Sequence, residues 1–182
     1  MNLRTFLPPA ATPTASPPAV GAAAPDLPPG APGEGPVVVA FLRHTGCPFA
    51  EWTAREIRTA AERDPGIAWV AVSHAPPEAT AAWAGAVGGV GDEVLLLSDP
   101  ERTSYAAWGL GRSSLAHFAG RRSLAQVARL AREGVRNRHP DGTRWQRAGT
   151  FAVDVERMVR WRHLPEHAGD LPDLRAAVQA LK

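Results

Sequence analysis

The sequence predicts a single α/β domain, a three-layer sandwich in which helices cover both faces of a central mixed sheet. Two observations carry this prediction. Short, continuously apolar segments, of which residues 37–42 are the clearest, are typical of strands buried on both faces. Segments with helical periodicity separate these strands, and such alternation gives parallel strands joined by crossover helices. With 182 residues, 45% of them hydrophobic, the chain is long enough to build one such core.

The amino-terminal residues predict an arm that precedes this domain. Prolines recur too often in residues 1–19 for a regular helix, so we expect a Pro/Ala-rich flexible arm over 1–19 and the folded domain over 20–182. The arm lacks the unbroken apolar core of a secretory signal, and no apolar run in the chain reaches membrane-spanning length. We therefore expect a cytoplasmic protein that does not associate with membranes.

The first half of the domain predicts a βαβαβ order. Pro48 suits the first position of a helix that Asp64-Pro65-Gly66 ends. A second buried strand is expected over 67–72, a short alanine-rich helix from Pro76, and a third strand over 93–98.

The second half predicts an insertion followed by a closing hairpin. After a short helix that ends at Gly109, the insertion spans about 112–147 and is expected to be helical over 113–134. Residues 151–155 and 158–163 predict two antiparallel strands, because only a tight turn joins them. Asp170 is expected to cap a final helix with Pro172 in its first turn. A βαβαβ start, a helical insertion and a terminal β-hairpin plus helix are the order of a thioredoxin-like fold.

Cys47, the single cysteine of the chain, is the main candidate for chemistry. It lies between the first strand and the first helix, where free backbone N–H groups and the helix dipole favour a thiolate. Arg43 or His44 would add to this effect if either side chain points to the thiol. The alternative is a buried cysteine that acts as a small apolar residue. One cysteine alone excludes an internal disulfide.

Residues 41–52, FLRHTGCPFAEW, resemble the active-site segment of peroxiredoxin-like proteins of the alkyl hydroperoxide reductase and thiol-specific antioxidant (AhpC/TSA) superfamily. Further similar stretches lie at 20–26, 98–111 and 146–154, so the resemblance extends over most of the domain. It implies a thioredoxin fold and a thiol-dependent redox enzyme, a thiol peroxidase or oxidoreductase of the one-cysteine type. This enzyme would reduce a peroxide or exchange thiol and disulfide, without a bound cofactor or metal.

The resemblance also implies roles for particular residues. Cys47 would be the nucleophile, regenerated by an external low-molecular-weight thiol or a redoxin. His44 or Thr45 would hydrogen-bond the peroxide or other small-molecule substrate, unless Thr45 only caps the helix and His44 lies on the surface. Arg147 would stabilise the thiolate and the developing charge on oxygen. A homodimer joined through Cys47 is a possible oxidised product.

The chain departs from the family pattern at several positions. Ala50 stands where many relatives carry a second, resolving cysteine, and Ala40 and His44 replace the family's proline and threonine. Arg147 lies one residue further from Phe151 than the corresponding family arginine. Gly149 takes the place of the cis-proline of thioredoxins. These differences leave open a redox-silent binding or scaffold protein, or a metabolite-tailoring enzyme, on the same fold.

The insertion carries an excess of arginine that a binding protein would use. Residues 112–147 contain nine arginines and two acidic residues, which gives this segment a net charge of +7, whereas the whole chain carries +2. This charge would suit an anionic substrate or an acidic partner, or the arginines would form a solvated face. No nucleic-acid-binding module accompanies them, so a nucleic-acid partner is not expected.

Glu51, four residues before Arg55, is expected to be a solvated first-turn carboxylate. Pro165 separates His163 from His167, so a metal site is not expected there.

Overall fold

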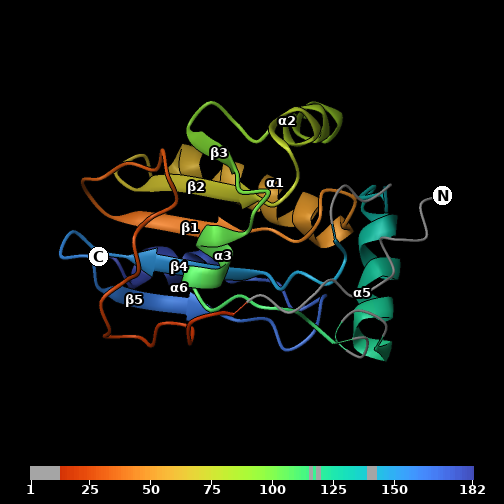
Figure 1. Cartoon of the computed structure of the whole chain (residues 1–182). Helices are drawn as coiled ribbons and strands as arrows, with labels where there is room; N and C mark the ends of the chain where they lie inside the picture. The colour runs from red at the N-terminus through yellow and green to blue at the C-terminus, as the bar shows by residue number, and fades with distance from the viewer. Residues whose placement is uncertain (1–12, 115–116, 118–119, 139–142) are drawn as a thin grey trace.

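The computed structural model describes residues 13–114, 117, 120–138 and 143–182, and it confirms the α/β prediction. Five strands form one mixed sheet in the order β3-β2-β1-β4-β5 (Figure 1). The strands are β1 (Val37–Phe41), β2 (Ala68–Ser73), β3 (Val94–Ser98), β4 (Gly149–Val153) and β5 (Val159–His163). β1, β2 and β3 run parallel, whereas β4 pairs antiparallel with both β1 and β5. The predicted terminal hairpin is thus confirmed.

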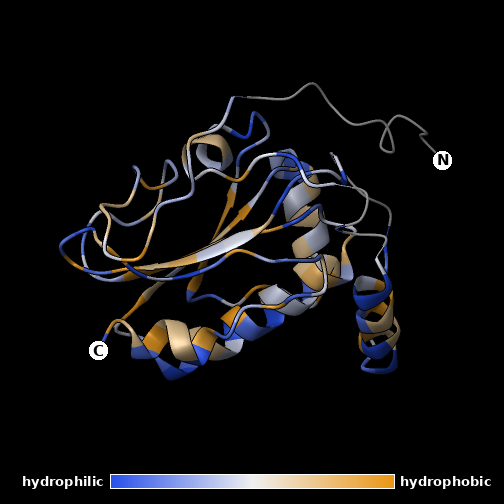
Figure 2. Cartoon of the chain, turned by 90° about the horizontal axis from the view of Figure 1, so that it is seen from below, coloured by the Kyte–Doolittle hydropathy of each residue, from blue (hydrophilic) through white to orange (hydrophobic). Residues whose placement is uncertain are grey.

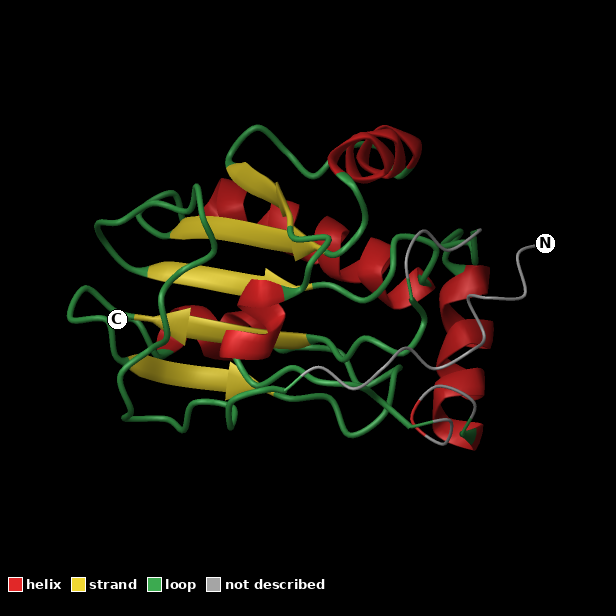
Figure 3. Ribbon diagram, viewed as in Figure 1, coloured by secondary structure: helices red, strands yellow, loops and turns green. Residues whose placement is uncertain are grey.

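Helices lie on both faces of this sheet, as Figure 3 shows. They are α1 (Pro48–Arg63), α2 (Pro77–Ala86), α3 (Thr103–Ala107), α5 (Arg121–Arg132) and α6 (Leu174–Gln179). None of the helices within the described residues is long and apolar enough to cross a membrane. β1 is buried along its whole length, as the apolar run predicts for a strand with neighbours on both sides.

The alternation of side chains along β1 divides the core in two. Val38, Ala40 and Leu42 face α1 and α6, where Ile57 and Val178 complete one apolar cluster. The colouring of Figure 2 shows apolar residues concentrated in the strands, with hydrophilic residues on the outer face of the helices.

The opposite face of β1 packs against an aromatic cluster. The Phe41 ring lies 5.0 Å from Tyr105 and 5.5 Å from Trp108, centroid to centroid, and Trp108 lies 4.8 Å from Phe151. These rings fix α3 against the carboxyl-terminal half of β1, because aromatic side chains bury a large area in few rotamers. The position of α3 therefore depends on the strand that leads to Cys47.

The largest differences from the predicted boundaries are at α5, β4 and α6. α5 begins at Arg121, with Gly120 as its N-cap, and ends at Arg132. Residues 115–116 and 118–119 of the helix expected over 113–134 lie outside the described residues. β4 begins at Gly149, two residues before the predicted start at Phe151, because Gly149 pairs with Phe41 of β1. Asp173 caps α6 by accepting from the N–H groups of Arg175 and Ala176. Asp170, the predicted cap, instead accepts from the N–H of Glu166 inside the preceding loop.

The described end of the expected amino-terminal arm lies against α3. The N–H of Ala15 donates to Ala106 O at 3.0 Å, and Pro17 contacts Gly109. Residues 1–12 of the expected arm lie outside the described residues, and the boundary at residue 20 stays a prediction.

Replacing Gly109 by alanine should detach this amino-terminal segment. Gly109 has φ +73°, and a Cβ there would lie 2.3 Å from the backbone N of Pro17. The backbone conformation alone costs an L-residue about 1–2 kcal/mol, and the backbone of Pro17 has to move as well. We expect a lower Tm and faster proteolysis near residue 17. Gly111→Ala is the matched control, since its Cβ would only touch the Thr14 side chain at 3.4 Å. Equal effects of the two substitutions would contradict this account.

The two ends of the insertion meet at its base. Arg112 and Gln146 form an antiparallel bridge, and the N–H of Ser113 donates to Trp145 O at 2.6 Å. On the other side of the bridge, the N–H of Arg147 donates to Gly111 O at 3.1 Å. The insertion therefore leaves and re-enters the domain at one place.

Candidate active site

Cys47 is the N-cap residue of α1 and follows β1 by a short loop. Its φ and ψ are −81° and 127°, an extended conformation, and Pro48 occupies the first turn. The Cys47 carbonyl accepts from the N–H groups of Ala50 and Glu51, at 3.0 and 3.2 Å, and the Cys47 N–H donates to His44 O at 2.9 Å. The predicted place of the cysteine at the helix start is confirmed, and the N-cap is Cys47 rather than Thr45. Only 3% of Cys47 is exposed.

The residues before Cys47 are buried with it. His44 is 4% exposed and Arg43 is 5% exposed, so the alternative of a surface histidine is wrong. Thr45 is buried too. Arg43 donates from Nη2 to the backbone oxygen of Arg144 at 2.9 Å, which holds the end of the insertion against this loop.

His74 joins the site from the neighbouring strand, although no motif in the sequence marks it as a candidate. Since β1 and β2 are parallel, with Phe41 opposite Val72, the residues two positions further along each strand, Arg43 and His74, leave the sheet at the same edge. The His74 ring stacks edge-to-face on Tyr105, with centroids 5.7 Å apart. The parallel register was the available signal, because it brings the residues that follow two such strands side by side.

Hydrogen bonds determine which nitrogen of His74 carries the proton. Nε2 lies 3.1 Å from the carbonyl oxygen of Thr143, which only accepts, so the hydrogen is on Nε2. Nδ1 of His74 is buried and has no hydrogen-bond partner among the described residues, and the same holds for Nδ1 of His44. Below the His74 ring, the Tyr105 hydroxyl donates to the carbonyl oxygens of Leu42 and Val72, at 2.7 and 2.8 Å.

The electrostatic surroundings keep both imidazoles neutral. Burial, reinforced by the charges of Arg102 and Arg43 and opposed by the Thr143 hydrogen bond, lowers the pKa of His74 to about 4. Burial also lowers the pKa of His44 well below its ordinary value, and the charges of Arg43 and Arg144 add to this. Burial, with a contribution from the charge of Asp99, raises the pKa of Tyr105 well above its ordinary value, so its hydroxyl stays a donor.

The low pKa of His74 predicts a loss of stability in acid. The unfolded chain takes up a proton near pH 6.5, whereas the folded protein does so only near pH 4, so protonation favours unfolding between these values. We expect this one group to reduce the free energy of unfolding by about 2 kcal/mol between pH 7 and pH 5. His74→Gln keeps a donor for Thr143 and should flatten the pH dependence by that amount. Denaturant unfolding at pH 8, 7 and 5 measures it, with pH 8 giving the packing cost alone. Parallel curves for the two proteins would refute the assignment.

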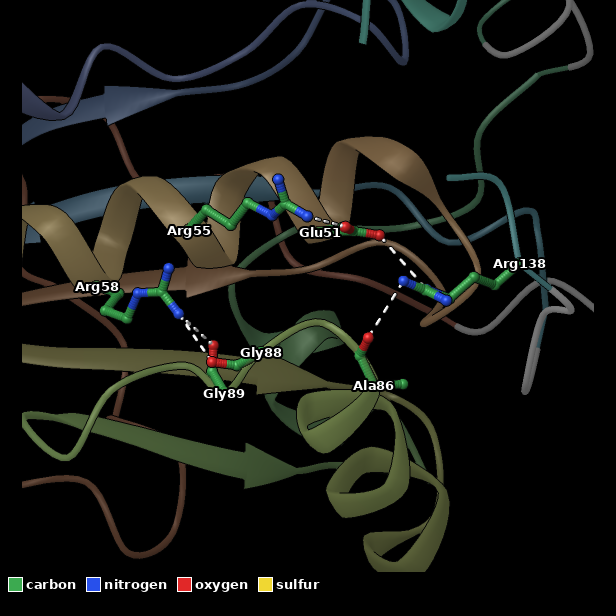
Figure 4. Close-up of polar contacts among 7 residues, drawn as sticks. All are labelled: Glu51, Arg55, Arg58, Ala86, Gly88, Gly89 and Arg138. Carbon is green, nitrogen blue, oxygen red and sulfur yellow. Dashed lines mark hydrogen bonds and ion pairs between the residues drawn. The ribbon is translucent and has the colours of Figure 1, made fainter. Parts of the chain in front are cut away.

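Glu51 is the centre of a buried ion-pair network rather than a solvated carboxylate. It is 1% exposed, with Arg55 Nη2 2.5 Å from Oε1 and Arg138 Nε 3.4 Å from Oε2 (Figure 4). The pairing with Arg55 was predicted, but the burial was not, because Arg138 reaches it from the insertion. Arg138 also donates to Ala86 O at 3.2 Å, and its backbone N–H donates to Gly46 O at 2.9 Å. One residue therefore joins the insertion to α1, to the end of α2 and to the loop before Cys47.

Arg147 contacts a different part of the site from Arg43. It is half-buried, its backbone binds Gly111, and its charge helps to lower the pKa of His117 to about 4, after burial and the charge of Arg43. Arg43 and Arg144 are the arginines whose charges act on His44. The described residues contain no group of three or more His, Cys, Asp or Glu side chains that could hold a metal ion.

A narrow crevice opens beside the start of α1. Arg43 lines it together with Phe49 and Ala50 of the first helical turn, and the start of β4 and the loop before α6 close it. Leu42, Phe49 and Ala148 supply apolar walls, whereas His163 and Asp170 supply polar ones. Its volume of about 20 Å³ has room for about one water molecule, and it adjoins the first turn of α1 without reaching Cys47 itself.

Fold and site together define a thioredoxin-like α/β protein with one buried thiol at the start of α1. The family model described as AhpC/TSA antioxidant enzyme matches residues 56–167, so the chain belongs to this family. The matched segment begins after Cys47 and includes the insertion. No curated protein matches the chain in sequence.

Solved structures support the same fold. A peroxiredoxin-like protein from Aquifex aeolicus is 15% identical, with a TM-score of 0.64 over 93% of this chain and 90% of its own. A thiol peroxidase from Chromobacterium violaceum is 13% identical, with a TM-score of 0.60 over 93% and 89%. Peroxidoxin BcpB from Mycobacterium tuberculosis is 21% identical, with a TM-score of 0.54 over 81% and 79%. The thioredoxin-like fold is thereby confirmed.

Proposed function

We propose that this protein is a one-cysteine thiol peroxidase in which Cys47 is the nucleophile. The observation that supports this most is the position of the only cysteine at the N-terminus of α1, in one tight turn with His44 and beside the Arg43 crevice. Membership of the AhpC/TSA family supports peroxide as the substrate and a thiol as the reductant.

The proposed cycle has two stages. The Cys47 thiolate attacks one oxygen of a hydroperoxide, the O–O bond breaks, and the leaving alkoxide takes a proton to give an alcohol and a cysteine sulfenic acid. An external thiol then condenses with the sulfenic acid, which releases water and forms a mixed disulfide with Cys47. A second external thiol attacks this mixed disulfide, so that Cys47 is released as a thiol and the two external thiols form a disulfide. The single cysteine of the chain makes an external thiol necessary, and a reducing compartment such as the cytoplasm would supply it.

Neighbouring groups have proposed roles in the first stage. The neutral imidazole of His44 and the hydroxyl of Thr45 are placed in the turn that leads to Cys47, where they would hydrogen-bond the peroxide. Arg43, which lines the crevice, is the better candidate than Arg147 for stabilising the charge that develops on oxygen.

The reaction of the reduced full-length protein with hydrogen peroxide tests the proposal. Tryptophan fluorescence gives the rate, because Trp52 on α1 packs against the cluster that contains Cys47, and a sulfenic-acid trap followed by peptide mass analysis locates the product. We expect a second-order rate constant about 100-fold or more above that of free cysteine, and the trap on Cys47. A rate equal to that of free cysteine would reject peroxidase activity.

The exposed arginines of α5 favour a second candidate, a binding protein without a redox cycle. Leu124 is 58% exposed on this helix, and the arginines around it point to solvent. A protein that fails the peroxide test would be examined for acidic partners at this helix, with Arg121→Glu and Arg122→Glu as variants. If these substitutions leave the salt-dependent binding of acidic partners unchanged, α5 is excluded as the binding surface.

A further inference from the structure

A cavity on the α3 face of the sheet is far larger than the crevice beside α1. Its volume is about 490 Å³, whereas the crevice has about 20 Å³. Val72 of β2 and Leu97 of β3 line it from the sheet, and residues 26–29 and α3, which lie on the same face in Figure 1, line it from the sides. Pockets that bind small molecules generally have about 300–1,000 Å³, so this cavity has room for an organic ligand.

The cavity exists because α3 is too short to cover this part of the sheet. α3 has five residues, which is about 7.5 Å of helix. Tyr105 and, just after the helix, Trp108 pack on Phe41 of β1, so α3 lies over the middle of the sheet. Residues 26–29 take the place of a helix beside β3, and Leu97 between them and α3 stays half-buried. The protein therefore leaves apolar surface of the sheet accessible at this cavity.

The charged groups that line the cavity are all acidic. They are Asp26, Asp99 and Glu101, and the described lining contains no lysine, arginine or histidine. None of these three carboxylates forms an ion pair with a residue that the structure describes. The side chain of Asp99 accepts from the first N–H groups of α3, which fixes its position. Asp26 and Glu101 are exposed, so their carboxylates are accessible to a ligand.

We propose that this cavity binds an organic cation, with an apolar body that lies on Val72 and Leu97 and an ammonium or guanidinium group that pairs with Asp26 and Glu101. Charge complementarity selects this class, since three carboxylates attract a cation and repel a carboxylate or phosphate ligand. A metal ion would contact the carboxylates and leave the apolar floor uncovered. The cavity and α1 lie on opposite faces of the sheet, so the proposal is independent of the reaction proposed for Cys47.

Calorimetric titration of the full-length protein with three matched probes tests the class of ligand. Tryptamine has an ammonium group and an apolar ring, tryptophol replaces the ammonium by a neutral hydroxyl, and ethylamine lacks the ring. We expect tryptamine to bind one site and to raise the Tm, because it binds the folded state. Tryptophol and ethylamine should each bind at least about tenfold more weakly. Equal affinity for tryptamine and tryptophol would overturn the proposed cation site.

Substitution of the two exposed carboxylates tests the location. Asp26→Asn/Glu101→Gln should weaken tryptamine binding about tenfold, because an exposed ion pair changes affinity by up to about fivefold. It should leave the weak binding of tryptophol unchanged. Asp92→Asn/Glu93→Gln is the matched control, since it removes the same charge from exposed positions outside the cavity lining. Wild-type affinity in the first variant, or an equal loss in both, would place the cation elsewhere and overturn the proposal.

Two other occupants give distinct results. Self-association that tryptamine reverses, measured by sedimentation, would place an arginine of a second copy in the cavity and overturn the assignment to a small molecule. Tighter binding of tryptamine by Arg4→Gln would show that the chain's own amino-terminal residues compete for the cavity, and would overturn it as well.

A further comparison separates this proposal from the peroxidase. Cys47→Ser should bind tryptamine as the wild type does, whereas it should not react with peroxide. A protein that reacts with peroxide but does not bind tryptamine overturns the cation site alone. Circular dichroism confirms that each variant compared is folded.

Discussion

Cys47→Ser should abolish the reaction with peroxide, reducing the second-order rate constant by about 1,000-fold or more. Serine keeps the shape of the side chain, but its hydroxyl is a weak nucleophile at neutral pH and forms no stable oxidised product equivalent to a sulfenic acid. Because Cys47 is the only cysteine, no other thiol in the chain can take over. The variant should also give no adduct with the sulfenic-acid trap. Stopped-flow fluorescence and mass analysis under the conditions used for the wild type measure both effects.

The main alternative to this interpretation is a structural effect of the substitution. Cys47 is part of an apolar cluster, so a serine hydroxyl there adds a polar group to a buried place. Cys47→Ala avoids this and should be equally inactive, with near-wild-type thermal unfolding. A wild-type rate in either variant would place the reactive group elsewhere and would contradict the proposed mechanism.

Removing both arginines around Glu51 should have the largest effect on stability. In Arg55→Met/Arg138→Met the carboxylate stays almost fully buried but loses both counter-charges, while methionine keeps the apolar part of each side chain. We expect a loss of about 3–5 kcal/mol in the free energy of unfolding, the cost typical of a buried charge left without its partner. Denaturant titration at pH 7 gives this value.

A third substitution distinguishes the lost charge pairing from lost packing. Adding Glu51→Met removes the buried charge and should restore most of the stability, since an apolar replacement of a whole buried ion-pair network is often neutral. Arg58→Met is the matched control on the same helix, because among the residues that the structure describes its guanidinium binds the carbonyl oxygens of Gly88 and Gly89 and no carboxylate (Figure 4). Glu51→Met should not rescue that variant. Failure of the triple variant to recover would show that the arginines act through packing.

The fold could be predicted because its core is built from local patterns. The run at 37–42 has no polar residue to mark an exposed face, and this alone places β1 inside the sheet with helices on both sides. Pro48 and Asp64-Pro65-Gly66 delimit α1 by backbone chemistry that acts within a few residues. The cap of α6 was assigned to the wrong aspartate because Asp170 and Asp173 both come just before the apolar residues that repeat with helical periodicity. The choice depends on a loop that Asp170 itself stabilises.

The candidate site was harder to predict, since it depends on contacts between distant segments. Cys47 follows from its position between strand and helix. Glu51 looks solvated in sequence because a first-turn carboxylate usually is, and only Arg138 of the insertion explains its burial. His74 carries no local motif, and its place beside Arg43 follows from the strand register. Arg144 is one of nine arginines in the insertion, and nothing in the sequence distinguishes it from those that face solvent.

The bridge between Arg112 and Gln146 makes the insertion a replaceable module. Because its two ends already lie side by side, a short turn between them would connect α3 to β4 without moving either element, and would remove Arg138 and Arg144 together. The sheet and the thiol belong to the constant scaffold, whereas the groups that approach the thiol from outside belong to the exchangeable part. A segment grafted at this one junction would change what reaches Cys47, provided that it also replaces Leu130 and Val135 in the core and supplies a partner for Glu51.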